Sequence, residues 1–84
     1  MTHSMKLAHV KWKDANSHDN AWMNISDADS GLSVVESVGW VLVNNKERIV
    51  LLPAIDVEGE QCFGAITIPK SWIIKITDLK VPNE

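Results

Sequence analysis

Four tryptophans give this chain its most distinctive chemistry, because it has no tyrosine and only one phenylalanine. Each indole offers a large apolar face and one N–H donor, which suits stacking on a base, a nucleotide or a proline-rich peptide. The alternative is that these rings fill a small core. Trp40 and Trp72 lie in β-rich runs and favour core or partial-core positions. Trp22 lies between polar, turn-forming segments and is the tryptophan that we expect to be exposed.

The segment 14–31 is rich in Asp, Asn and Ser and predicts an irregular, exposed loop region. Binding function concentrates in such loops when a rigid scaffold holds them. We therefore predict a contact surface around this segment, with neighbours from the region that follows Pro69. The candidate binding residues are Trp12, Asp14, His18, Trp22, Lys70 and Trp72.

A metal site is the second chemistry that the side chains could offer. His3, His9 and His18 lie near Asp14 and Asp19, but their spacings match no ligand motif with a recognisable geometry. Solvated roles are the better interpretation, and we expect neither a metal nor a cofactor.

Hydrolytic chemistry would need a nucleophile, a base and an orienting group. Ser37, Ser71 and Cys62 are available, but none lies in a nucleophile elbow or beside a histidine in the sequence. Small barrels also rarely enclose a cavity that excludes water from a substrate. We expect no enzymatic activity, and we interpret the lone Cys62 as a small buried hydrophobe rather than a reactive thiol.

Length and composition indicate one globular domain of 84 residues, 45% of them hydrophobic. The formal charge of −3 and the scattered basic residues argue against binding to nucleic acid. Apolar runs reach only four or five residues, so we expect no membrane span, and we expect no secretory signal. The lone cysteine makes a reducing cytosol the simplest compartment.

The elements that position these side chains are expected to be strands, because apolar residues alternate and no helical period lasts beyond a turn or two. The five expected strands cover residues 7–13, 34–43, 47–57, 61–68 and 72–77. We predict a single domain over residues 7–79, between a loose N-terminus at 1–6 and a tail at 80–84.

Bends and turns are predicted from particular residues. Gly39 suggests a bulge or sharp bend within its strand, and Asn44-Asn45 suits a two-residue hairpin turn. Pro53 favours an edge or bulge position, and Gly59 marks a second hairpin.

The corner at Pro69 predicts how the sheet closes. A central strand cannot pass through proline, so we expect a strand that ends at Ile68, one short 3₁₀ turn, and a new strand from Trp72. Gly64, Ile68, Pro69, Trp72 and Ile73 resemble the strand–turn–strand corner of Src-homology-three-like domains. We therefore predict an all-β fold, a small five-stranded antiparallel barrel of the Src-homology-three or Sm kind. The resemblance is architectural and implies no shared ligand.

A broader resemblance covers roughly residues 10–79. The motifs that carry it are Trp12-Lys13-Asp14, Trp22, Ser37-Val38-Gly39-Trp40, Ile49-Val50-Leu51 and Ile68-Pro69-Lys70 with Ile73 and Ile76. Together they resemble a group of small, functionally unassigned proteins of tailed bacteriophages and prophages. The resemblance implies a phage origin and a bacterial cytoplasmic setting, and it brings no known site residues.

Three functions remain open from the sequence. The favoured one is a non-enzymatic, phage-encoded binding module that occupies a host protein or a small ligand. The second is a self-associating structural or assembly protein, since a chain this short gains stability from oligomerisation, and we expect a homodimer or higher oligomer. The third, a nucleic-acid-binding small barrel, is disfavoured by the acidic charge balance.

Overall fold

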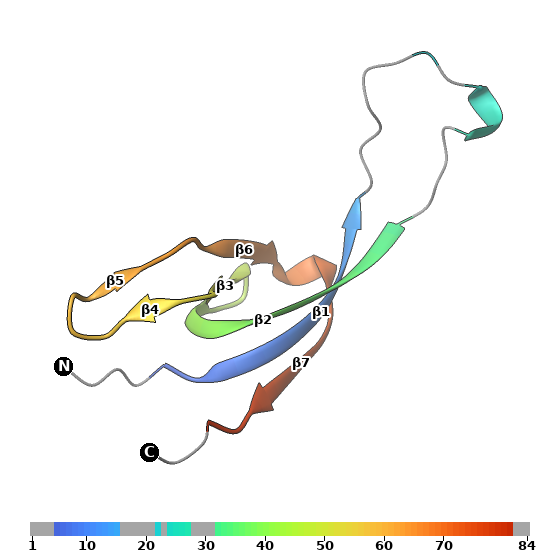
Figure 1. The fold of residues 1–84 in the computed structure, drawn as a ribbon. Helices are drawn as coiled ribbons and strands as arrows, with labels where there is room; N and C mark the ends of the chain where they lie inside the picture. The colour runs from blue at the N-terminus through green and yellow to red at the C-terminus, as the bar shows by residue number, and fades with distance from the viewer. Residues whose placement is uncertain (1–4, 16–21, 23, 28–31, 82–84) are drawn as a thin grey trace.

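The chain forms an all-β structure in the part that the computed structural model describes, which is residues 5–15, 22, 24–27 and 32–81 (Figure 1). No α-helix occurs in this part. The strands are β1 (Leu7–Ala15), β2 (Leu32–Asn44), β3 (Arg48–Leu52), β4 (Ile55–Asp56), β5 (Gln61–Cys62), β6 (Ile66–Pro69) and β7 (Ile73–Leu79). Two single-turn 3₁₀ helices are η1 (Ile25–Asp27) and η2 (Lys70–Trp72).

Five of these strands form one antiparallel sheet in the order β6-β3-β2-β1-β7, and β4 and β5 form a separate two-stranded hairpin (Figure 1). This arrangement confirms the predicted all-β class and the five-stranded antiparallel sheet. No hydrogen-bonded ladder between described residues joins β6 to β7, so the sheet is open at these two strands. The pairing of β6 with β7 that would close the predicted barrel is therefore absent among the described residues.

The core lies on one face of the sheet, the face to which alternate residues of β1, Ala8 and Val10, point. Ala8 and Val10 are buried, whereas Lys11 and Lys13 on the same strand are exposed. The buried cluster consists of Val10, Ile49, Leu51 and Ile68, and Trp12, Val41, Ile73 and Ile76 pack against it. One cluster thus receives side chains from all five strands of the sheet.

The corner at Pro69 is confirmed, with its boundaries one residue later than predicted. β6 ends at Pro69, η2 makes one turn, and β7 begins at Ile73 rather than at Trp72. The backbone N–H of Lys70 donates to Glu47 O at 2.9 Å. This bond fixes η2 against the β2–β3 turn.

The prediction of a bulge at Gly39 is wrong. Gly39 pairs in register with Ala8, and the register shift in β2 falls between Val41 and Val43. The glycine instead permits a close approach, because a Cβ atom at this position would lie 2.9 Å from Leu52 O.

The expected two-residue turn at Asn44-Asn45 is also displaced. Asn44 is the last residue of β2 and pairs with Ile49. Asn45 Oδ1 accepts hydrogen bonds from the backbone N–H groups of Glu47 at 2.9 Å and Arg48 at 3.0 Å. The side chain of Asn45 therefore shapes a three-residue connection by replacing backbone acceptors.

Each of the two long strands predicted over 47–57 and 61–68 is divided in two. β3 stops at Leu52 because Pro53 has no N–H for the ladder. Gly64 adopts a φ of 79°, which interrupts the chain between β5 and β6. The predicted turn around Gly59 connects β4 and β5. The backbone N–H of Gly59 donates to Asp56 Oδ1 at 3.1 Å.

Cys62 is exposed, so its interpretation as a buried hydrophobe is wrong. It pairs with Ile55 in the two-stranded hairpin, outside the five-stranded sheet. A two-stranded hairpin lacks the further strands that would bury both of its faces, which explains why Cys62 is exposed.

Candidate functional site

Two of the predicted contact residues, Trp12 and Trp72, form a stacked aromatic pair. Their ring centroids are 6.3 Å apart and their planes differ by 16°. Trp12 comes from β1 and is half-buried, whereas Trp72 ends η2 and keeps 41% of its surface exposed. Trp72 is therefore more exposed than its predicted core or partial-core position. The pair presents one aromatic surface to solvent.

Local contacts hold both rings in place. Trp12 Nε1 donates to Ser37 Oγ on β2 at 3.1 Å, which fixes the rotation of the indole. Trp72 is held through η2, which contacts β1 and is bonded to the β2–β3 turn by the Lys70 N–H. An aromatic pair in this separation range contributes about 0.5–1.5 kcal/mol beyond its buried area.

Asp14 and Lys70 lie on the same two elements as the tryptophan pair. Asp14 follows Trp12 by two positions on β1, so both side chains lie on the same face of the sheet. Lys70 is the first residue of η2, and both charged residues are half-buried. The elements β1 and η2 thus carry four of the six predicted contact residues.

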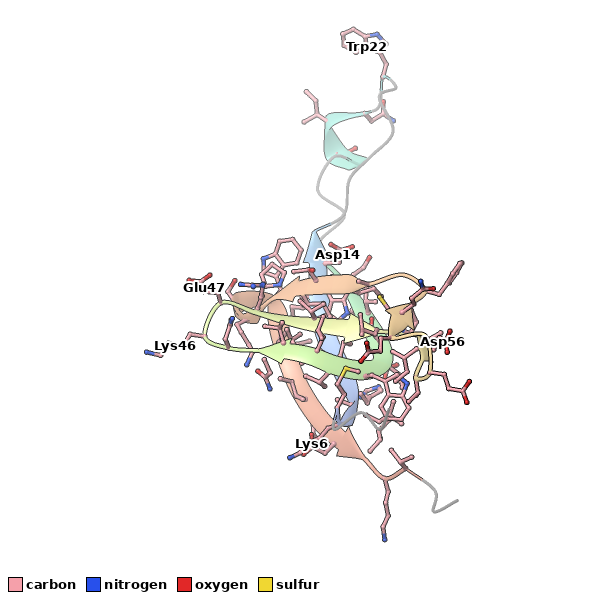
Figure 2. The ribbon with its side chains drawn as sticks, turned by 90° about the vertical axis from the view of Figure 1, so that its left-hand side faces the viewer. Lys6, Asp14, Trp22, Lys46, Glu47 and Asp56 are labelled. Atoms are coloured by element: carbon pink, nitrogen blue, oxygen red, sulfur yellow. The ribbon has the colours of Figure 1, made fainter. Side chains whose placement is uncertain are left out.

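Of the other two predicted contact residues, the structure describes only Trp22, and it does not join this surface. Trp22 is fully exposed, as expected, and Figure 2 shows it far from the sheet and from Asp14. His18 lies outside the described residues. The predicted single surface is therefore reduced to the part carried by β1 and η2, which we call the Trp12–Trp72 surface (Trp12, Asp14, Lys70 and Trp72).

A separate apolar pocket of about 360 Å³ lies where the β4–β5 hairpin meets β2 and β3. Its apolar lining comes from Met5, Leu42, Leu52, Ile55, Val57 and Cys62. Sequence reasoning missed this pocket because it depends on how the hairpin lies relative to β2. The interruption of the apolar run at Pro53 was the one available signal.

The polar contacts of the described residues include no recognisable catalytic arrangement. His9 Nε2 lies 3.0 Å from Glu36 Oε1 across β1 and β2, with the glutamate well exposed. Within the described ranges, no group of three or more His, Cys, Asp or Glu side chains is placed to hold a metal ion. What the geometry does offer is a stacked aromatic pair on β1 and η2, two elements that each also carry one charged residue, Asp14 and Lys70.

No helix in the described part of the chain has the length and apolar character needed to cross a membrane. The chain matches no known family model, no curated protein and no solved structure.

Proposed function

We propose that this chain is a non-enzymatic binding module of phage origin that binds a host protein through the Trp12–Trp72 surface. The observation that carries the proposal is the stacked pair itself, because an aromatic surface is held rigidly and still left partly exposed. The resemblance of its motifs to small phage proteins supports the phage origin.

Rigidity favours binding because ordered side chains lose little entropy when a partner arrives. Trp12 is fixed by its hydrogen bond to Ser37, and η2 is fixed by its bond to Glu47. Tryptophan is enriched among the central contacts of protein interfaces, whereas charged side chains such as Asp and Lys occur mainly at the polar rim. Asp14 and Lys70 add charges of both signs, which suits a mixed protein surface better than a uniform polyanion.

Replacing Trp72 by alanine is expected to weaken partner binding about 30-fold, the effect of losing a central aromatic anchor. The partner is first captured from bacterial lysate and identified by mass spectrometry, and its affinity for purified wild type and variants is then measured by calorimetry. Trp22→Ala is the matched control, since it removes the same side chain far from the surface. Thermal unfolding of both variants checks that each is folded.

The two variants separate the possible contact regions. Retention of full affinity by Trp72→Ala, with loss in Trp22→Ala, would place the contact elsewhere on the chain and contradict the proposed surface. An identified partner that binds both variants like wild type would contradict it equally.

We also propose that the sheet coils into a small barrel of the Src-homology-three or Sm kind. The support is the shared cluster, in which Val10 of β1 packs with Ile49 of β3 and Ile68 of β6. In a flat sheet, neighbouring strands lie about 4.8 Å apart, so β6 and β7 would be separated by roughly 19 Å. The 3₁₀ turn that joins these two strands directly also favours coiling.

Methyl nuclear Overhauser effects test this architecture in solution. We expect cross-peaks that connect the methyl groups of Val10 on β1 or Ile76 on β7 with those of Ile49 on β3 or Ile68 on β6. A flat sheet would give none, because β2 intervenes between β1 and β3. The exposed Val38 methyl groups serve as the control and should show no cross-peak to Ile68.

A further inference from the structure

Charge is segregated along this chain in a way that the proposed function does not use. No lysine or arginine occurs between Ile49 and Pro69, and this stretch holds three acidic residues. They are Asp56, Glu58 and Glu60, all exposed, and they lie in the β4–β5 hairpin and its turn. We call these three residues the acidic hairpin. Phe63, directly after β5, leaves 84% of its surface exposed beside it.

The opposite charge gathers on the outer face of β1 and β7. Lys11 and Lys13 alternate with the core-facing Val10 and Trp12, so they point away from the core. Lys75 of β7 pairs directly with Lys11. We call Lys11, Lys13 and Lys75 the basic strand face. All three lysines are exposed, and none forms an ion pair with a carboxylate among the described residues.

This face carries an unfavourable feature that an acidic partner would relieve. Like charges directly opposite one another across two strands destabilise a sheet, and Lys11 faces Lys75 in this manner. Glu36 pairs with Lys11 from β2, and its carboxylate, hydrogen-bonded to His9, adds one negative charge to this face. Three lysines against one glutamate still leave the face positive. On the same face of β2, Val34 and Val38 are each more than half exposed.

We propose that the acidic hairpin of one copy of this chain docks on the basic strand face of a second copy. The carboxylates of the acidic hairpin would meet the three ammonium groups. Val34 and Val38 lie roughly 13 Å apart along β2, so the Phe63 ring would cover one of them. A second copy is favoured over a nucleic acid because one partner satisfies both charged surfaces. The net charge of −3 also repels a polyanion.

The free strand edges of the sheet are poorly suited to the same role. β7 carries Lys75 and a register shift near Trp12, and β6 is four residues long and ends in proline. Lysine, bulges, proline and short length are the features that block pairing between edges. Association through the two charged surfaces is heterologous, so it generates a ring or an open chain of copies.

Sedimentation velocity at low and high salt is the first test. We expect an assembly at about 50 mM salt that dissociates at about 500 mM, where the Debye length falls below about 5 Å. Two charge-reversal variants then address each surface separately. The hairpin variant carries Glu58→Lys and Glu60→Lys, and the strand variant carries Lys11→Glu and Lys13→Glu. Each alone is expected to weaken self-association at least about tenfold, because like charges then meet.

Mixing the two variants is the decisive measurement. The basic hairpin of one variant complements the acidic strand face of the other, so an equimolar mixture should regain assembly that neither variant shows alone. The control variant exchanges two charges in the β2–β3 turn, Lys46→Glu and Glu47→Lys. Figure 2 shows this turn and Asp56 on opposite sides of the molecule, so the control should assemble like wild type. Circular dichroism verifies folding, and Lys75→Glu replaces the strand variant if that variant fails to fold.

Several outcomes would overturn the proposal. A wild-type monomer at all salt and protein concentrations would do so, as would reversal variants that assemble like wild type or a mixture that stays monomeric. Binding of a single-stranded oligo(dT) probe by monomeric wild type, lost in the strand variant, would assign the basic strand face to nucleic acid instead.

Discussion

Replacing Ile49 by alanine is expected to lower the free energy of unfolding by about 3 kcal/mol. Ile49 has no exposed surface and packs in the cluster with Val10, Leu51 and Ile68. Truncation removes the transfer free energy of the lost methylenes and leaves a cavity that the surrounding sheet only partly fills. Urea unfolding followed by tryptophan fluorescence measures the change, since Trp12 packs against the same cluster.

Ile74→Ala is the matched control for this prediction. Ile74 has the same side chain but is 47% exposed on β7, so its truncation loses less buried surface and leaves no enclosed cavity, and the change should stay below about 1 kcal/mol. A chain of this size has a small stability margin, and Ile49→Val, with an expected cost of about 1 kcal/mol, keeps the test measurable. Equal losses in Ile49→Ala and Ile74→Ala would contradict the assigned core.

The strands and the corner were predictable because their signals are local. Alternation in β1 separates the buried Val10 from the exposed Lys11 without knowledge of any partner strand. Pro69 ends β6 for a reason that holds in every sheet, the missing N–H. The turn around Gly59 followed from the same kind of local chemistry.

The candidate site was only partly predictable, because it depends on contacts between distant segments. The sequence singled out Trp12 and Trp72, but their stacking requires η2 to lie against β1, which neither segment specifies alone. The segregation of lysines onto one face likewise follows from the pairing of Lys11 with Lys75. Register is set by the burial of a whole face and by turn geometry, so it emerges only when the sheet is assembled.

The incorrect predictions have the same origin. Cys62 lies in a run whose residues resemble a core strand, but its partner is a short hairpin strand rather than the main sheet. The break at Pro53 divides one predicted strand into two, and a propensity argument cannot say which side of the proline remains in the sheet.

Gly39→Ala is expected to lower the free energy of unfolding by about 1–3 kcal/mol, and Gly39→Val by more. A Cβ atom at Gly39 would lie 2.9 Å from Leu52 O and 3.1 Å from Leu51 Cβ. Both neighbours belong to β3, whose backbone pairs with β2 and cannot retreat without losing ladder bonds. Urea unfolding of the variants measures the cost, with Val38→Ala on the adjacent exposed position as the control.

The sign of the Gly39→Ala effect distinguishes a close contact with β3 from an open position in the strand. Where a strand has room for a side chain, replacing glycine by alanine stabilises a protein by about 0.4–1 kcal/mol, because the unfolded chain loses conformational freedom. Gly39 has no positive φ, so backbone strain does not explain a loss. Destabilisation must then report the close contact with β3. A neutral or stabilising result would show that Leu51 and Leu52 of β3 do not approach Gly39 this closely in solution.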